Sequence, residues 1–163
     1  MAGNKKPRKP HRRRQGSAVG GLFAVQHRHD EAALSQPMTD DQVGDLALAF
    51  RLAFQAMVSG AADEQHWSTC VCSLNIALVL AEQGIGADWE PEFNAALEGA
   101  FRAKLRAGRT GSWGFDGPAM QAIKEAFELH ELQIESATKG EIKAALIEVR
   151  RRIDAGDVYQ EAA

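Results

Sequence analysis

Residues 39–60 read TDDQVGDLALAFRLAFQAMVSG, and their apolar side chains recur with the period of an α-helix. Thr39 and Gln42 have the spacing of a capping box, which marks the start of the helix. Gly60 is placed to end it. The apolar stripe consists of Val43, Leu46, Ala47, Phe50, Ala53, Phe54, Met57 and Val58. An amphipathic helix with both ends marked indicates a helical fold.

Four further helices follow from the same reasoning. Segment 62–83 is apolar on nearly every side, which is typical of a central helix. Asp88 and Pro91 open a third helix that ends near Gly108. The remaining boundaries are Asp116 with Pro118 for the fourth helix, and Thr138 with Glu141 for a fifth helix that closes at Gly156. Because the connections are short, the sequence predicts an all-α fold, an antiparallel bundle of about five helices.

Three expectations concern polar and apolar residues inside this bundle. Asn75 is the polar exception in the most apolar helix, and we expect a buried amide that fixes packing. His130 lies on the apolar face of the fourth helix, where a histidine bonded to a neighbour is expected rather than a catalytic base. The fifth helix is expected to bury one face, formed by Ile142, Ala145, Leu146, Val149 and Ile153.

The N-terminal segment differs from the rest of the chain in charge. Its first 14 residues hold no acid and seven cations: Lys5, Lys6, Arg8, Lys9, Arg12, Arg13 and Arg14. The other 149 residues hold 12 basic and 22 acidic ones. We expect a disordered basic arm and linker over residues 1–36, a helical domain over 37–157 and a short tail over 158–163. Such an arm is suited to bind DNA, RNA or an acidic partner.

A second basic group lies at the end of the third helix. Arg102, Arg106 and Arg109 share one helix face, and Trp113 follows in the loop, so the face can contact phosphates while the indole stacks a base. The alternative is structural, because cations are favoured near a helix C-terminus. Trp113 and Phe115 would then pack against the end of the bundle or form a surface that binds another protein.

A metal site is a weaker alternative. His66 and Cys70 are four residues apart with Asp63 one turn earlier, which is a spacing of metal ligands, but a fourth ligand is not evident. The sequence also lacks a Gly-x-Ser-x-Gly nucleophile motif and a phosphate-binding glycine loop. We therefore expect a non-enzymatic protein without a cofactor.

Composition bears on the location of the protein. No run approaches the roughly 18 apolar residues of a membrane span, so a membrane partner is not expected. The basic segment is not followed by the apolar core of a signal peptide, so export is not expected. Cys70 and Cys72 point in different directions on one helix and cannot pair with each other. These features favour a cytoplasmic location.

Several short stretches carry a resemblance. They are HW at 66–67, LNIAL at 74–78, GIG at 84–86, GSWGFDG at 111–117 and LH at 129–130. Together they resemble uncharacterised small helical proteins of proteobacterial prophages and other mobile elements. The resemblance implies a cytoplasmic accessory protein of bacterial or phage origin and supplies no catalytic residues.

These observations lead to one functional expectation and one main alternative. We expect an accessory or regulatory protein that binds nucleic acid or an acidic partner through its arm. The helical body would bind other proteins, including a second copy of itself. The alternative is a protein–protein adaptor, or an inhibitor of host machinery, with no nucleic-acid role.

Overall fold

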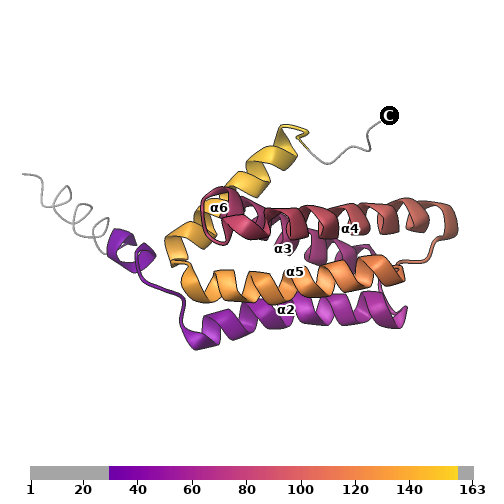
Figure 1. The fold of residues 1–163 in the computed structure, drawn as a ribbon, viewed down its shortest axis with the longest axis horizontal. Helices are drawn as coiled ribbons and strands as arrows, with labels where there is room; N and C mark the ends of the chain where they lie inside the picture. The colour runs from indigo at the N-terminus through magenta and orange to yellow at the C-terminus, as the bar shows by residue number, and fades with distance from the viewer. Residues whose placement is uncertain (1–29, 158–163) are drawn as a thin grey trace, which may run out of the picture. The chain divides into compact units, whose positions relative to one another are not determined.

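The computed structural model describes residues 30–157, which confirm the all-α antiparallel bundle (Figure 1). A short 3₁₀ helix, η1, precedes α4, and no strand occurs within residues 30–157. The helices are α2 (Asp40–Ser59), α3 (Glu64–Glu82), η1 (Ala87–Trp89), α4 (Glu90–Thr110), α5 (Gly117–Ser136) and α6 (Lys139–Asp154).

Helix α3 is the central element, as its apolar composition predicts. It packs against each of α2, α4, α5 and α6. Its buried side chains are Cys70, Leu74, Ala77, Val79, Leu80 and Ala81. A helix that contacts neighbours on several sides needs apolar residues on several sides, which explains its weak amphipathicity.

The core is built from aromatic and small side chains. Phe50 of α2 and Phe127 of α5 have ring centroids 4.6 Å apart, and both are buried. Helices α4 and α5 pack closely because Gly99 faces Ala119, where a Cβ on the glycine would lie 2.9 Å from the alanine Cβ. Figure 1 shows α2 and α5 side by side along most of their length. Close helix approach at small residues thus complements the aromatic packing.

Several predicted helix ends are confirmed. The Gln42 amide N–H donates to Thr39 Oγ1 at 3.3 Å, and the Thr39 N–H donates to Gln42 Oε1 at 3.1 Å. Gly60 adopts the left-handed conformation (φ 76°) that ends α2. Thr138 and Glu141 form the second predicted capping box, at the start of α6. These ends were predictable because their interactions are local.

Helix α4 differs from the prediction at both ends. Asp88 lies in η1, and Trp89 occupies the N-cap position of α4. The helix continues through Gly108 to Thr110 and ends at Gly111, which has φ 71°. Two glycines could have stopped the helix, and the second one takes the left-handed conformation, so the helix gains almost one more turn.

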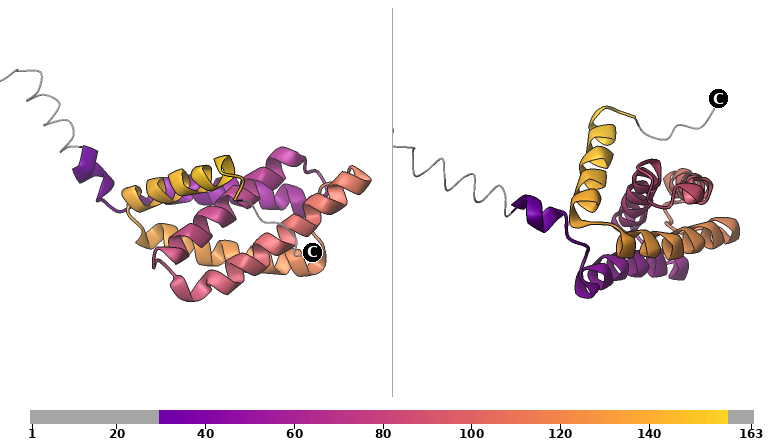
Figure 2. Two further views of the ribbon diagram at one scale, coloured as in Figure 1. Left: turned by 90° about the horizontal axis from the view of Figure 1, so that it is seen from above. Right: turned by 60° about the vertical axis from the view of Figure 1, so that its left-hand side comes forward.

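Helix α6 contradicts part of the expected inner face. Ala145 and Val149 are buried and Ile142 is partly buried, but Leu146 is 49% exposed and Ile153 is 55% exposed. The reason is that α6 crosses the other helices and packs mainly on α3, as Figure 2 shows. One main neighbour covers only one side of a helix.

Residues 36–37, just before α2, contact the start of α6. Residues 30–34 are helical, and the Gln36 carbonyl accepts a hydrogen bond from the Lys139 N–H at 3.0 Å. Pro37 and Thr138 form an isolated antiparallel bridge. Most of the predicted arm and linker (1–36), and the predicted tail (158–163), lie outside the described residues.

Candidate functional site

Two tryptophans and two cations meet where α3, α4 and the loop 111–116 come together. This group, Trp67, Lys104, Arg106 and Trp113, is called the tryptophan corner. The two indole centroids are 5.6 Å apart and tilted by 41°. Lys104 Nζ lies 5.1 Å from the Trp67 ring centroid, within cation–π range. The Trp67 Nε1–H donates to the Ala100 carbonyl at 2.8 Å, so the indole N–H is satisfied inside the protein.

Arg106 fixes the loop of the tryptophan corner. Its guanidinium donates to the Gly114 carbonyl and lies 3.6 Å from the Asp116 carboxylate. Asp116 also accepts from the Ala119 N–H at 2.8 Å, which confirms its predicted role as the cap of α5. Trp113 forms an isolated bridge with Ala62. The loop is therefore held by the side chain of Arg106 and by the backbone bridge between Trp113 and Ala62.

The three arginines predicted to form one phosphate-binding face have different surroundings. Arg102 donates to Glu98 at 2.9 Å on the exposed side of α4. Arg106 faces the loop, where its guanidinium is engaged with Gly114 and Asp116. Arg109 is exposed near the helix end. One of the three thus serves the fold, which reduces the cationic surface available on α4.

The two loop aromatics are also placed differently. Phe115 is only 8% exposed, and its ring stacks on Phe54 at a centroid distance of 6.0 Å. Trp113 is partly exposed beside Trp67. Of the two residues predicted for protein interaction, Trp113 therefore retains accessible surface while Phe115 belongs to the core.

The cations of the predicted arm lie outside the described residues; they are Lys5, Lys6, Arg8, Lys9, Arg12, Arg13 and Arg14. Their role stays a prediction from the sequence.

The residues considered for a metal site serve local structure. His66 Nδ1 is 2.6 Å from Asp63 Oδ1, and these two residues form a capping box at the start of α3. Hydrogen bonds from His66 lower the pKa of Asp63. Cys70 is fully buried, and burial raises the pKa of its thiol to about 12, so it is a neutral thiol at physiological pH. In residues 30–157, no group of three His, Cys, Asp or Glu residues has a geometry suited to a metal ion.

A buried pair, His130 and Gln133, connects α5 to α3. Gln133 Nε2 donates to the Ala77 carbonyl at 3.0 Å and to the Ile85 carbonyl at 2.7 Å. These two bonds orient the amide, so its oxygen accepts from His130 Nδ1–H at 3.0 Å. The expectation that His130 bonds a neighbour is confirmed. Burial lowers the pKa of His130 to about 4, so the imidazole is neutral at physiological pH.

Sequence reasoning missed Gln133 and chose Asn75 instead. Asn75 is partly buried, but its amide donates to the Val71 carbonyl of its own helix at 2.8 Å. It therefore does not join two helices. The available signal for Gln133 was its position on the apolar face of α5, three residues after His130.

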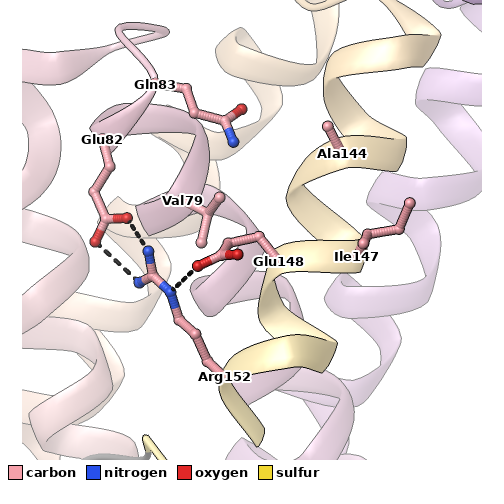
Figure 3. A pocket seen from close by; sticks show the side chains of 7 residues that line it. All are labelled: Val79, Glu82, Gln83, Ala144, Ile147, Glu148 and Arg152. Carbon is pink, nitrogen blue, oxygen red and sulfur yellow. Dashed lines mark hydrogen bonds and ion pairs between the residues drawn. The ribbon is translucent and has the colours of Figure 1, made fainter. Parts of the chain in front are cut away.

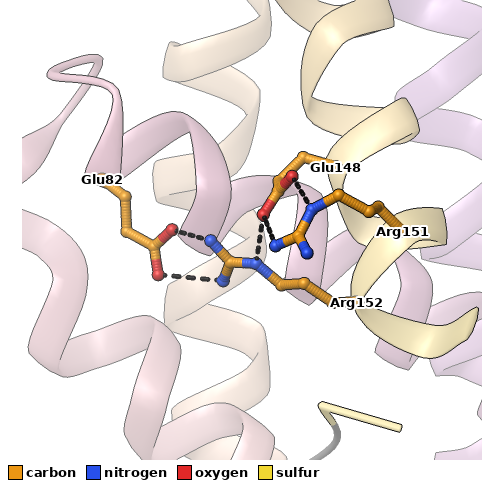
Figure 4. A network of polar contacts seen from close by, with 4 residues as sticks. All are labelled: Glu82, Glu148, Arg151 and Arg152. Atoms are coloured by element: carbon orange, nitrogen blue, oxygen red, sulfur yellow. Dashed lines mark hydrogen bonds and ion pairs between the residues drawn. The ribbon is translucent and has the colours of Figure 1, made fainter. Parts of the chain in front are cut away.

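A shallow groove of about 500 Å³ lies between α3 and α6 (Figure 3). At the edge of the groove, Arg152 donates hydrogen bonds to two carboxylates. One belongs to Glu82 of α3 and the other to Glu148, at 2.8 Å. Arg151 also donates to Glu148, as Figure 4 shows. These hydrogen bonds lower the pKa of Glu148 to about 2. The guanidinium of Arg152 is thus engaged by protein carboxylates, and the network fastens α6 to α3.

Large apolar side chains are exposed on four helices, including Leu105 of α4 and Leu132 of α5. Leu48 and Leu52 lie on the outer side of α2, away from its predicted stripe, and are 55% and 60% exposed. On α6 the exposed residues are Leu146, Ile147 and Ile153. Sequence reasoning missed these surfaces as sites, although Leu48, Leu52 and Ile147 fall outside the predicted inner faces.

Comparison with known proteins adds no assignment. No family model matches the sequence, and no curated protein and no solved structure is significantly similar to it. In the part of the chain that the structure describes, none of the helices combines the length and apolarity needed to cross a bilayer.

Proposed function

We propose that this chain is a non-enzymatic accessory protein that binds nucleic acid through its N-terminal arm and other proteins through its helical body. The observation that carries the proposal is the separation of charge. Seven cations and no acid occupy residues 1–14, whereas acids outnumber bases by 22 to 12 in the remaining 149 residues. A body of that charge repels phosphates, so the arm is the favoured point of contact.

The surroundings of the α4 arginines support assigning the arm the main role. Arg106 is engaged with Gly114 and Asp116, and Arg102 is paired with Glu98. A phosphate that bound these two arginines would compete with carboxylates already in place. The arm cations have no acid among their near neighbours in the sequence.

A salt titration tests the nucleic-acid part of the proposal. Full-length protein is titrated into labelled single-stranded RNA and duplex DNA over a salt series. If all seven arm cations contact phosphates, the slope of log K against log [salt] is about −5 for single strands and about −6 for duplex DNA. An arm variant with all seven cations replaced by Gln should lose this salt-sensitive binding.

The matched control places the same substitution on the body. The double variant Arg102→Gln/Arg109→Gln removes two exposed cations without disturbing the loop contacts of Arg106. It should keep most of the affinity and change the slope by less than about 2. If the body variant loses binding and the arm variant retains it, the arm assignment is wrong.

The adaptor alternative is favoured by a different observation, the partly exposed Trp113 beside Trp67 and Lys104. Indole surface at a fixed loop is a common anchor of protein interfaces. Under this alternative, Trp113→Ala abolishes capture of a protein partner, and replacing the arm cations leaves capture intact. Absence of any DNA or RNA binding at low salt would favour the adaptor.

A further inference from the structure

We infer that the exposed side of α2 and α5 binds a basic amphipathic helix of a protein partner. The inference rests on the proposed protein-binding role of the helical body, and it names the surface and the chemistry of the partner. Helices α2 and α5 lie side by side (Figure 1). Together they carry seven acids and two cations, whereas α3, α4 and α6 together carry eight acids and nine cations. The acidic excess of the helices is thus concentrated on this pair.

Both cations of the pair are already engaged with acids. Arg51 of α2 donates two hydrogen bonds to Glu131 of α5, and Lys124 Nζ lies 3.9 Å from a carboxylate oxygen of Glu128. The remaining acids include Asp45 and Glu135, which are exposed and form no ion pair within residues 30–157. A cationic ligand therefore finds carboxylates here that have no counterion in the described part of the chain.

Three exposed leucines accompany these acids. Leu48 and Leu52 of α2 are 55% and 60% exposed, and Leu132 of α5 is 50% exposed. Each of the two free carboxylates is three residues from a leucine on the same helix, so acidic and apolar side chains are neighbours there. We call this group the acidic leucine face; it consists of Asp45, Leu48, Leu52, Leu132 and Glu135.

The acidic leucine face borders a groove between the two helices. The groove has a volume of about 320 Å³ and is lined by Phe54 of α2, Phe127 of α5 and the ion pair of Arg51 with Glu131. Leu48 lies one turn before Arg51, which places it at the edge of the groove. An apolar side chain of a partner helix can therefore be anchored in the groove while its neighbours cover the leucines.

Charge complementarity selects the occupant among the possible ones. A helix with apolar residues on one side and Lys or Arg on its flanks covers the leucines and pairs with the free carboxylates. Nucleic acid and acidic helices are repelled by this surface. A second copy that used the same face would bring acids against acids. A basic segment without apolar side chains would leave the leucines in water.

A peptide titration tests the inference. The probe is a 14-residue amphipathic helix with seven lysines on one side and leucine and alanine on the other, titrated into nuclease-treated full-length protein. We expect a dissociation constant on the order of 10 µM by calorimetry. A peptide of residues 1–14 has the same length and seven cations but no leucine, and it should bind about tenfold more weakly.

Leucine variants locate the binding site of the amphipathic peptide. Leu48→Ser/Leu132→Ser should weaken its binding about tenfold, with unchanged helical circular dichroism. The control Leu146→Ser/Ile153→Ser changes two residues of similar exposure on α6 and should bind the peptide normally. Equal losses in the two variants would overturn the inference.

Carboxylate variants test the charge argument. Asp45→Asn/Glu135→Gln should weaken peptide binding about fivefold and reduce its salt dependence. The control Asp88→Asn/Glu90→Gln removes two exposed acids elsewhere on the body and should change the affinity by less than about twofold. Equal effects of the two variants would show that the peptide responds to net charge alone, which would overturn the inference.

Two further results would overturn it. One is the absence of amphipathic peptide binding at about 200 µM, and the other is equal affinity for the peptide of residues 1–14. These measurements contain no nucleic acid, so such results leave the nucleic-acid proposal intact. Capture of a protein partner that is abolished by Trp113→Ala, but not by the Leu48/Leu132 variant, would place protein binding at the tryptophan corner instead.

Discussion

The Gln133 side chain makes three hydrogen bonds at a position with no exposed surface. Its acceptors, the carbonyls of Ala77 and Ile85, lie 56 and 48 residues earlier in the chain. Such partners cannot be inferred from local spacing, which is why a buried amide was expected at Asn75 instead. Helix periodicity identifies the face on which a residue lies, whereas the backbone groups opposite it depend on the packing of distant elements.

Replacing Gln133 tests how much this connection stabilises the fold. Gln133→Leu removes the side-chain donor to the Ala77 and Ile85 carbonyls and leaves the His130 N–H without its acceptor in the interior. We expect a loss of about 3 kcal/mol in the free energy of unfolding, measured with urea. Gln121→Leu places the same substitution on the exposed side of α5 and should change stability by less than about 0.5 kcal/mol. Equal effects of the two substitutions would contradict the assigned role of Gln133.

His130 makes stability depend on pH in a defined window. Its pKa is about 4 in the folded protein and about 6.5 when unfolded, so between these values protons bind preferentially to the unfolded chain. The contribution is complete above about pH 6.5 and is lost as pH falls toward 4, amounting to about 3 kcal/mol. Urea unfolding at a series of pH values should show this slope. His130→Phe should flatten it, whereas His66→Gln should leave it in place.

Individual helices show where sequence rules succeed and where they fail. The caps at Thr39, Asp116 and Thr138 were predicted, because each depends on residues within one turn. The end of α4 was not predicted, because Gly108 and Gly111 are equally good stop signals locally. Arg106 of the last turns of α4 contacts Gly114 and Asp116, which lie just beyond this end.

Two glycine substitutions test the observed end of α4. Gly108 is helical, and an added Cβ would meet nothing within 4 Å, so Gly108→Ala should raise stability by about 0.5–1 kcal/mol. Gly111 has φ 71°, so Gly111→Ala should lower stability by about 1 kcal/mol. Thermal or urea unfolding measures both. The opposite pair of signs would place the helix end at Gly108.

Arg106 and Arg102 allow a paired test of the loop contacts. Arg106→Gln removes the guanidinium that contacts Gly114 and Asp116, and we expect a loss of about 1–2 kcal/mol. Arg102→Gln removes an exposed pair with Glu98 and should cost less than about 0.5 kcal/mol. Unfolding of both variants in urea measures the difference. A larger cost at Arg102 would mean that the loop is held by other contacts.

In the whole molecule, the elements differ in how firmly they are embedded. Helix α3 packs against four helices, whereas α6 packs mainly on α3 and buries only Ala145 and Val149. The sequence predicted the central place of α3 from its composition, but it predicted α6 to be better covered than it is. Coverage depends on the angle at which a helix crosses its neighbours, and hydrophobic periodicity carries no information about that angle. The exposed apolar residues of α6 were therefore not predicted, whereas the basic arm was, because its charge is visible in composition alone.

Hydrogen exchange should report this difference in embedding. We expect amides of α6 (Lys139–Asp154) to exchange faster than those of α3 (Glu64–Glu82) in dilute protein, because few buried contacts oppose local opening of α6. Mass spectrometry of proteolytic fragments resolves the two segments. Equal protection of α6 and α3 in dilute protein would contradict the expectation.

The close approach of Trp67 and Trp113 has a spectroscopic consequence. Their indoles belong to different segments, and a centroid separation of 5.6 Å permits their electronic transitions to couple. The resulting exciton signal in circular dichroism depends on the loop 111–116 being seated against α3, and it does not depend on helix content. The protein therefore carries an intrinsic optical reporter of this loop. A ligand or partner that displaces Trp113 would be detectable without any added label.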